Sequence, residues 1–150
     1  MDKNINNSLK EHGYILSEQV GHLIRKSYQK HTAIFQSLSY DEQLTSIQFA
    51  TLCTIVERGP SSLTELVNET DIDQATIRGV VKRLMARELI QRVQDTQDNR
   101  KVIITITPEG RKLVEKMLPS AKKITEETLK NLNETEKVAF LFLLKKITED

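Results

Sequence analysis

Residues 62–110 read SLTELVNETDIDQATIRGVVKRLMARELIQRVQDTQDNRKVIITITPEG, and this stretch decides the fold. Ser62, with Glu65 three residues later, has the pattern of a capping box at a helix start, and Asp73 is a second N-cap candidate. Apolar residues recur at helical spacing after each cap, and the polar run 68–72 between them is typical of a turn. The stretch therefore predicts a short helix, a turn and a second helix.

The second of these helices is predicted to have two unlike sides. Gln74, Arg78 and Lys82 fall at positions i, i+4 and i+8 on its outer side. Residues 74–101 hold seven basic and three acidic side chains, so positive charge gathers here in a chain whose net charge is only +1. The residues predicted to face the core are Ile77, Val80, Val81, Leu84 and Met85.

The hydrophobic pattern changes from helical spacing to alternation after Leu89. Residues 90–94 and 102–107 are β-rich runs with a polar tip at 95–100 between them, which predicts a two-stranded hairpin. Thr107-Pro108 then signals the start of another helix. A helix-turn-helix followed directly by a hairpin predicts a winged helix-turn-helix, in which the hairpin is the wing.

The sequence before this stretch predicts two more helices. Residues 14–38 carry apolar side chains at helical spacing without a proline, and such a helix is longer than a small core can cover. Thr45 and Gln48 form a capping box for the next helix, which Gly59-Pro60 ends.

The sequence after the hairpin predicts two C-terminal helices. The first begins at Pro108, and Pro119 is expected to kink or break it. Asn133 and Glu136 cap the second, whose residues 138–147 are too apolar for an exposed terminus. The predicted fold class is mainly α with a small β-hairpin wing, a winged helix-turn-helix with N- and C-terminal helices that pack on a partner.

Length and composition fit one soluble, folded domain over residues 1–150, with 38% hydrophobic and 29% charged residues. Residues 1–12 are expected to be a frayed arm. The chain has no long apolar run and no signal-peptide core, so a cytoplasmic location without membrane contact is expected. The single cysteine and the three widely spaced histidines give no disulfide and no metal-ligand pattern, and no phosphate loop or nucleophile elbow is present. We therefore expect no enzyme activity, no catalytic residue, no cofactor and no metal.

These elements together predict a site for double-stranded DNA. The major groove admits one helix, where arginine can bind guanine, glutamine can bind adenine, and the methyl groups of alanine and threonine can contact thymine. Gly79 removes bulk where the helix approaches the duplex. A basic helix face that is merely solvated is the alternative, which the adjoining turn and hairpin disfavour. The predicted DNA-binding residues are Ser62, Gln74, Ala75, Thr76, Arg78, Gly79, Lys82 and Arg83.

The segment from Leu44 to Gly110 resembles the DNA-binding lobe of the MarR family of transcriptional regulators. The most specific match is Asp95-x-x-Asp98-x-Arg100, followed by Ile106-Thr107-Pro108-Glu109-Gly110. The resemblance implies that Arg100 enters the minor groove from the wing tip and that Asp98 supports the wing through a salt bridge. Narrow A·T-rich minor grooves attract arginine side chains, which agrees with the role of Arg100. Both residues therefore join the predicted DNA-binding set. The chain departs from the family at Ile106, usually leucine, and at Glu88, usually glycine.

The resemblance covers nearly the whole chain and implies a homodimer. Within a single domain, residues 14–43 and 108–150 are expected to be dimerisation helices and residues 44–107 the DNA-binding lobe. A two-fold dimer presents its two recognition helices to successive major grooves, which predicts a pseudo-palindromic operator with half-sites about 10 base pairs apart.

The first long helix also carries a candidate ligand site. His22, Arg25 and Gln29 lie on one face beside the apolar stripe, flanked by Tyr28 and His31. An arginine with a histidine and an amide at an apolar rim suits an aromatic carboxylate.

Residues 21–35 are similar to the branch of the family that responds to aromatic or hydroxycinnamic acids, the HcaR-like members. This similarity implies a repressor that a small aromatic acid releases. The predicted ligand-binding residues are His22, Arg25, Tyr28 and Gln29, with Arg25 holding the carboxylate. The alternative is that these groups face solvent or form a hydrogen bond between subunits.

Two other functions are open. Some MarR relatives sense oxidants through a cysteine near the start of the first helix, but Cys53 lies within the second helix, so a buried, inert thiol is favoured over a redox-responsive one. A winged helix can also serve as a protein-interaction scaffold, and DNA binding that weakens steeply with salt would distinguish a regulator from a scaffold.

Overall fold

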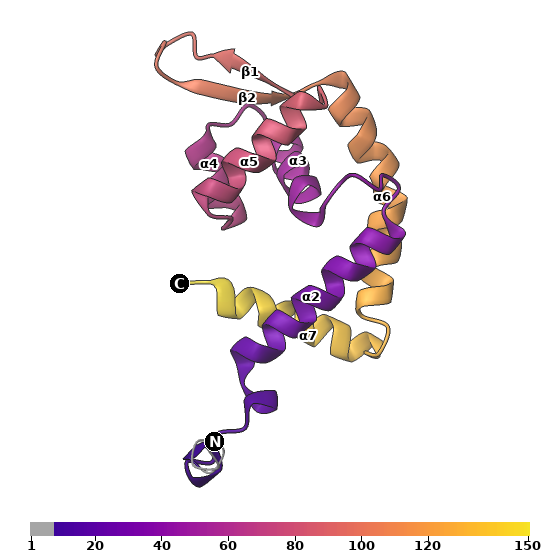
Figure 1. Ribbon diagram of the computed structural model, residues 1–150. Coiled ribbons are helices and arrows are strands. Elements are labelled where there is room, and N and C mark those ends of the chain that lie inside the picture. Colours follow the sequence, from indigo (N-terminus) through magenta and orange to yellow (C-terminus); the bar gives the residue numbers. More distant parts are fainter. Residues whose placement is uncertain (1–7) are drawn as a thin grey trace, which may run out of the picture.

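The computed structural model describes residues 8–150 and has two parts joined by one long helix (Figure 1). The upper part in Figure 1 holds the helices between residues 46 and 86 and the two-stranded hairpin, the lower part holds the helix that starts at Val20 and the C-terminal helix, and the helix that follows the hairpin runs from one part to the other. The elements are the 3₁₀ turn η1 (Leu16–Glu18), the helices α2 (Val20–Leu38), α3 (Ser46–Arg58), α4 (Leu63–Thr70), α5 (Gln74–Ala86), α6 (Pro108–Thr128) and α7 (Glu134–Thr148), and the strands β1 (Ile90–Gln94) and β2 (Val102–Ile106). The predicted fold class, mainly α with a hairpin wing, is confirmed.

The helix starts follow the capping patterns of the sequence. In α3 the Thr45 hydroxyl accepts a hydrogen bond from the backbone N–H of Gln48, whose side chain accepts one from the Thr45 N–H. The same reciprocal pair joins Ser62 to Glu65 at α4. Asn133 and Glu136 form the third such pair, at α7. Each pair satisfies backbone donors that a helix leaves without intrahelical partners, which is why these boundaries could be predicted.

The core lies where α3, α4, α5, the wing and α6 meet. Leu52, Leu66, Ile77 and Leu84 come from three different helices of the helix-turn-helix region, and each has no exposed surface. Met117 of α6, also fully buried, extends this core toward α2. Each Å² of apolar surface that is removed from water stabilises the fold by about 25 cal/mol. This shared core therefore holds the helix-turn-helix and α6 together as one unit.

The wing is an antiparallel hairpin in which Ile90 pairs with Ile106 and Arg92 with Ile104. Ile104 also exchanges two backbone hydrogen bonds, of 3.0 and 2.8 Å, with Ser61 in the turn before α4. Ile104 is buried. The base of the wing is therefore fixed to the helix-turn-helix, while residues 95–100 extend from it as the tip (Figure 1).

The first helix is shorter than residues 14–38. Residues 16–18 form only the 3₁₀ turn η1, and Gln19 is extended, with φ −80° and ψ 132°, before α2 begins at Val20. A long helix through this region would place Gly21 in its interior, where glycine is unfavourable by about 1 kcal/mol relative to alanine. The predicted uninterrupted helix is wrong at its N-terminal end.

Two smaller expectations also need correction. Helix α6 runs unbroken through Pro119, so the predicted break is wrong. Pro119 has no backbone N–H to donate to the carbonyl of Glu115. Both residues are exposed, so water can donate to that carbonyl instead. Residues 8–11 are helical rather than frayed, and the rest of the predicted arm, residues 1–7, lies outside the described residues. No helix within residues 8–150 is long and apolar enough to cross a membrane.

Candidate nucleic-acid interface

Helix α5 has the two sides that its sequence predicts. Ile77, Val80, Val81 and Leu84 are buried in the core. On the opposite side the exposed residues are Gln74, Ala75, Arg78, Lys82 and Arg83, and Gly79 is half-buried. The outer side can therefore approach a duplex without any rearrangement of the core.

The start of α5 is fixed by two hydrogen bonds from Thr76 to Asp73. The Thr76 backbone N–H donates to Asp73 Oδ1 at 2.9 Å and the Thr76 hydroxyl donates to Oδ2 at 2.6 Å. The side-chain bond from Thr76, followed by the backbone bond, lowers the pKa of the Asp73 carboxyl. Because its hydroxyl proton is engaged in this way, Thr76 can offer a base its methyl group and the acceptor capacity of the hydroxyl oxygen.

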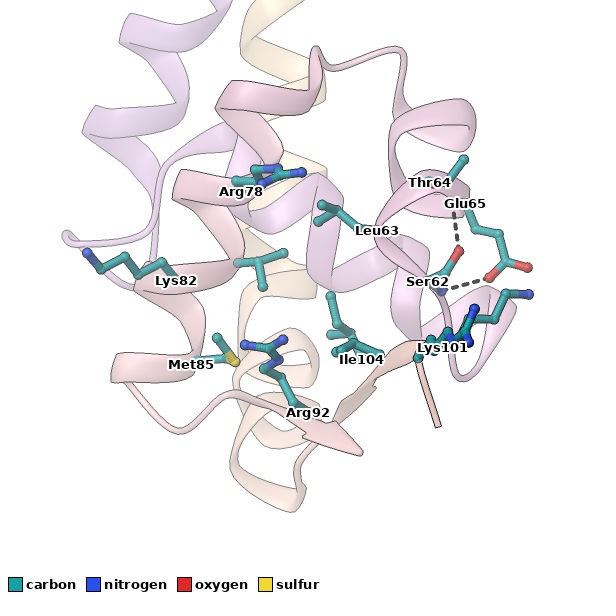
Figure 2. A pocket seen from close by; sticks show the side chains of 13 residues that line it. Ser62, Leu63, Thr64, Glu65, Arg78, Lys82, Met85, Arg92, Lys101 and Ile104 are labelled. Carbon is teal, nitrogen blue, oxygen red and sulfur yellow. Dashed lines mark hydrogen bonds between the residues drawn. The ribbon is translucent and has the colours of Figure 1, made fainter. Parts of the chain in front are cut away.

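A cleft of about 860 Å³ lies between α5, the wing and the start of α4, and we call it the basic cleft (Figure 2). Its floor is apolar and includes Leu63 and Ile104, which face the centre of the cleft in Figure 2. Five basic side chains and one acidic side chain are among the residues that line it. The full lining is Ser62, Leu63, Thr64, Glu65, Arg78, Val81, Lys82, Met85, Arg92, Arg100, Lys101, Val102 and Ile104.

Glu65, the acidic residue of the cleft, is already engaged by neighbouring groups. Its Oε2 accepts a hydrogen bond of 2.7 Å from the Ser62 backbone N–H, and its Oε1 lies 3.5 Å from Arg58 Nη2 (Figure 2 shows the Ser62 bonds). The Ser62 bond is the largest influence that lowers the pKa of the Glu65 carboxyl, and the charge of Arg58 adds to it. The Ser62 hydroxyl accepts from the Glu65 N–H at 3.2 Å, so the structure places Ser62 at the cleft primarily as a helix cap.

The wing tip is organised by Asp98. Its Oδ1 accepts a hydrogen bond of 3.0 Å from the backbone N–H of Arg100, and its carbonyl accepts one of 2.9 Å from Lys101. Within residues 8–150 no ion pair involves Asp98, so the implied salt bridge is replaced by a hydrogen bond to the backbone. The carboxylate nevertheless shapes the turn that presents the exposed Arg100 side chain.

The predicted ligand residues only partly gather at a cavity. His22 Nδ1 lies 3.2 Å from Arg25 Nη2, and Arg25, Tyr28 and Gln29 are exposed. A second, mostly apolar depression of about 460 Å³ lies between α2, α6 and α7, and we call it the apolar hollow. Tyr28 lines it, whereas His22, Arg25 and Gln29 do not. Its lining is Val20, Leu23, Ile24, Ser27, Tyr28, His31, Thr125, Thr128, Leu129, Phe140, Leu141 and Leu144.

His31 lines the apolar hollow and lies outside the predicted ligand-binding set. The Thr128 hydroxyl donates to the carbonyl of Ile124 at 2.7 Å, so its oxygen accepts the 3.0 Å hydrogen bond from His31 Nδ1. Burial lowers the pKa of His31. Helical spacing predicts His31 beside the candidate ligand site but cannot show its contact with Thr128 of α6, which is 97 residues away along the chain.

Sequence reasoning also missed Arg92 and Lys101 as residues of the basic cleft. Arg92 pairs with Ile104, so the two side chains lie on the same face of the wing. The alternation of the hairpin could have indicated this, because Ile90 and Ile104 point to the core and Arg92 shares their side. Lys101 lies in the cleft beside Glu65 (Figure 2).

Comparison with known proteins identifies the family. The family described as "Transcriptional regulator SarA/Rot" matches residues 33–117. The transcriptional repressor NicR of Pseudomonas putida is 54% identical over 136 residues, which cover 91% of this chain and 86% of NicR. The multiple antibiotic resistance protein MarR of Salmonella typhimurium is 28% identical over 85% of this chain and 90% of MarR.

A solved structure agrees with these relatives. BpsR of Bordetella bronchiseptica, whose DNA binding is regulated by 6-hydroxynicotinic acid, superimposes with a TM-score of 0.86 at 50% identity and covers 91% of this chain and 98% of its own. The hairpin, the two-sided α5 and these matches agree on one assignment. The chain belongs to the MarR family of winged helix-turn-helix, DNA-binding transcriptional regulators.

Proposed function

We propose that the chain represses transcription as a homodimer bound to a pseudo-palindromic operator, and that a small aromatic acid releases it. In this proposal residues 44–107 form the DNA-binding lobe, and residues 14–43 and 108–150 form the dimerisation helices. The observation that carries the proposal is the arrangement of α5, which buries its apolar side and presents Arg78 and Lys82 at the basic cleft. Such a regulator acts in the cytoplasm, where a bacterial operator is located.

The first turns of α5 enter the major groove. Gln74 and Arg78 then reach base edges, and the methyl groups of Ala75 and Thr76 contact thymine. The wing tip lies in the adjacent minor groove, where Arg100 is attracted by the strong negative potential of a narrow A·T-rich segment.

The exposed apolar surface supports a homodimer. Helix α7 contains no buried residue, although Val138 is 71% exposed and Phe142 63% exposed. Val20 of α2 is 69% exposed. Apolar surface of this extent on two neighbouring helices is unfavourable in water and favours association with a second copy.

DNA binding can be tested with a duplex selected from a random-sequence library by the purified protein. We expect a two-fold symmetric site, a complex of two chains per duplex, and an affinity that falls steeply as salt rises. Arg100→Ala should weaken binding at least tenfold, about 1.4 kcal/mol or more, without changing dimerisation. Selection of no preferred sequence, with salt-independent binding, would instead favour a protein-interaction scaffold.

The aromatic acid is proposed from the likeness to BpsR and from the polar groups of α2. BpsR is half identical to this chain and responds to 6-hydroxynicotinic acid. The Arg25 guanidinium, hydrogen-bonded to His22, can hold a carboxylate, and Tyr28 connects this exposed pair to the apolar hollow. In this proposal Gln29 adds an amide, and hydroxycinnamic acids are the other candidate ligands.

Calorimetry tests the ligand and its site together. 6-Hydroxynicotinate, 4-hydroxycinnamate and benzoate are titrated into the native protein, Arg25→Ala, and the matched control Lys26→Ala, which removes a neighbouring exposed charge. We expect one of these acids to bind the native protein and the control equally and Arg25→Ala at least tenfold more weakly. Equal binding by Arg25→Ala removes Arg25 from the site, and no binding of any acid removes the proposed ligand class.

The redox alternative has less support. Cys53 is half-buried, and burial raises the pKa of its thiol, with the Glu57 carboxylate adding to the effect. A protonated thiol is a poor nucleophile toward peroxide. Mass spectrometry after mild peroxide treatment tests this alternative, and rapid sulfenate formation at Cys53 would restore it.

A further inference from the structure

We propose that one sugar-phosphate strand of the operator runs through the basic cleft and that Arg92, assisted by Lys101, neutralises its phosphates. These residues would then supply affinity that is independent of base sequence. The inference rests on the proposed docking, with α5 in a major groove and Arg100 in a minor groove.

The path of the strand follows from DNA geometry. A major groove and the adjacent minor groove are separated by one sugar-phosphate backbone. A protein that places α5 in the first and the wing tip in the second must receive that backbone between the two elements. The basic cleft lies between α5 and the wing, with Arg78 and Lys82 on the helix side and Arg92 and Arg100 on the wing side.

The charges of the cleft suit a phosphate backbone. Of the side chains that line it, five are basic and one is acidic. In the described part of the chain none of the five basic residues forms an ion pair, whereas the acidic residue, Glu65, is paired with Arg58. A basic side chain without an ion-pair partner binds a phosphate more favourably than a paired one, because no ion pair within the protein has to break.

Arg92 is the best placed of these cations for a fixed backbone contact. Its pairing partner Ile104 is only 2% exposed and is hydrogen-bonded to Ser61, so this part of the wing is anchored to the core. Figure 2 shows the Arg92 guanidinium beside Met85, on the last turns of α5. The N-terminal turns of α5 are the ones that reach bases. Arg92 therefore lies away from the bases and faces the sugar-phosphate strand.

The experiment measures the salt dependence of binding to two duplexes of about 30 base pairs, one of mixed sequence and one selected by the native protein. Titrations between about 0.05 and 0.3 M potassium chloride give the slope of log affinity against log salt. The variants are Arg92→Ala, Arg92→Lys and the matched control Lys123→Ala, an exposed lysine of α6 outside the cleft. Thermal melts of each variant show whether the fold is intact.

For Arg92→Ala we expect the slope to decrease by about one for each phosphate that the variant no longer neutralises, or about two for a dimer. Both duplexes should bind about tenfold more weakly, and the ratio between the two affinities should stay unchanged. Arg92→Lys and Lys123→Ala should keep the native slope. Lys101→Ala should change the slope in the same direction as Arg92→Ala.

The inference is overturned if Arg92→Ala keeps the native slope, if its weaker binding is confined to the selected duplex, or if Arg92→Lys lowers the slope as much as Arg92→Ala. In each case the native protein still binds DNA with a steep salt dependence, so the proposed function stands. If the native protein binds neither duplex, the proposed function itself fails.

Discussion

A Cβ atom built on Gly110 would lie 2.0 Å from the carbonyl oxygen of Leu89. The first turn of α6 therefore passes directly against the chain that enters the wing. Thr107 makes the same connection through its backbone N–H, which donates to Leu89 O at 3.1 Å, and through its hydroxyl, which donates to Glu88 O at 2.7 Å. The sequence Thr-Pro-Glu-Gly thus joins the wing to α6 as well as starting the helix.

Gly110→Ala should destabilise the protein by about 1–3 kcal/mol or more, because the obstructing atoms belong to the backbone and cannot rotate away. Urea unfolding followed by circular dichroism measures the change. Ser120→Ala, a change to an alanine elsewhere in α6, is the control and should stay within about 0.5 kcal/mol of the native value. A native-like stability for Gly110→Ala would contradict the close approach.

Gly79→Ala should have opposite effects on stability and on DNA binding. The added methyl group would meet only Arg83 Nη1, at 3.8 Å, and alanine in a helix interior is more stable than glycine by about 0.5–1 kcal/mol. The same methyl group obstructs a duplex that approaches this side of α5. Urea unfolding and fluorescence anisotropy with the selected duplex check the two effects, and an unchanged DNA affinity would show that Gly79 lies away from the DNA.

Glu88→Gly should stabilise the fold by about 1 kcal/mol. Glu88 has φ +58°, in the left-handed region that glycine adopts without strain. Asp71, with φ +52°, ends α4 in the same conformation, so Asp71→Gly provides a parallel measurement. A drop in stability in Glu88→Gly would mean that the side chain contributes more than its backbone strain costs.

The ion pair between Arg87 Nη2 and Asp41 Oδ2, 2.5 Å long, should couple the end of α5 to the segment between α2 and α3. The side chains are 31% and 16% exposed, so breaking the pair by Arg87→Ala or Asp41→Ala should cost about 1–2 kcal/mol. A double-mutant cycle isolates the pair, and an interaction energy near zero would show that the contact is incidental.

His31 should make stability depend on pH near neutrality. Its pKa is lowered by burial, so the unfolded chain binds the proton more readily than the folded one. The contribution is fully present above the unfolded pKa, about 6.5, and is lost as pH falls through the lower folded pKa. Between these values the unfolding free energy of the native protein should fall more steeply with decreasing pH than that of His31→Asn. An unfolding free energy that depends on pH no more steeply in the native protein than in His31→Asn would contradict this contribution.

The local elements could be predicted from the sequence because their signals are local. The Thr45, Ser62, Asp73 and Asn133 caps each act within three residues, and the two sides of α5 follow from helical spacing alone. The hairpin could be predicted in the same way, because alternating apolar and polar residues and a polar tip between them define it.

The parts that could not be predicted depend on distant contacts or on small local energies. The contact of His31 with Thr128, and the apolar hollow beside it, need α2 and α6 to be placed together. The cleft position of Arg92 depends on how the wing is anchored to Ser61. The first helix is interrupted at Gln19, whereas α6 continues through Pro119. In both places the free energies of the continuous and the interrupted helix differ by only about 1–3 kcal/mol, so packing and solvent exposure decide between them.

Helix α6 starts at the base of the wing and reaches the region of α2 and α7 without a break. Its 21 residues make a rod of about 32 Å, so a tilt of about 5° at one end displaces the other by about 3 Å. A hydrogen bond to a base edge tolerates only a few tenths of an ångström. A small shift in the relative positions of α2 and α7 can therefore move α5 out of register with the bases, while the helix-turn-helix itself stays folded.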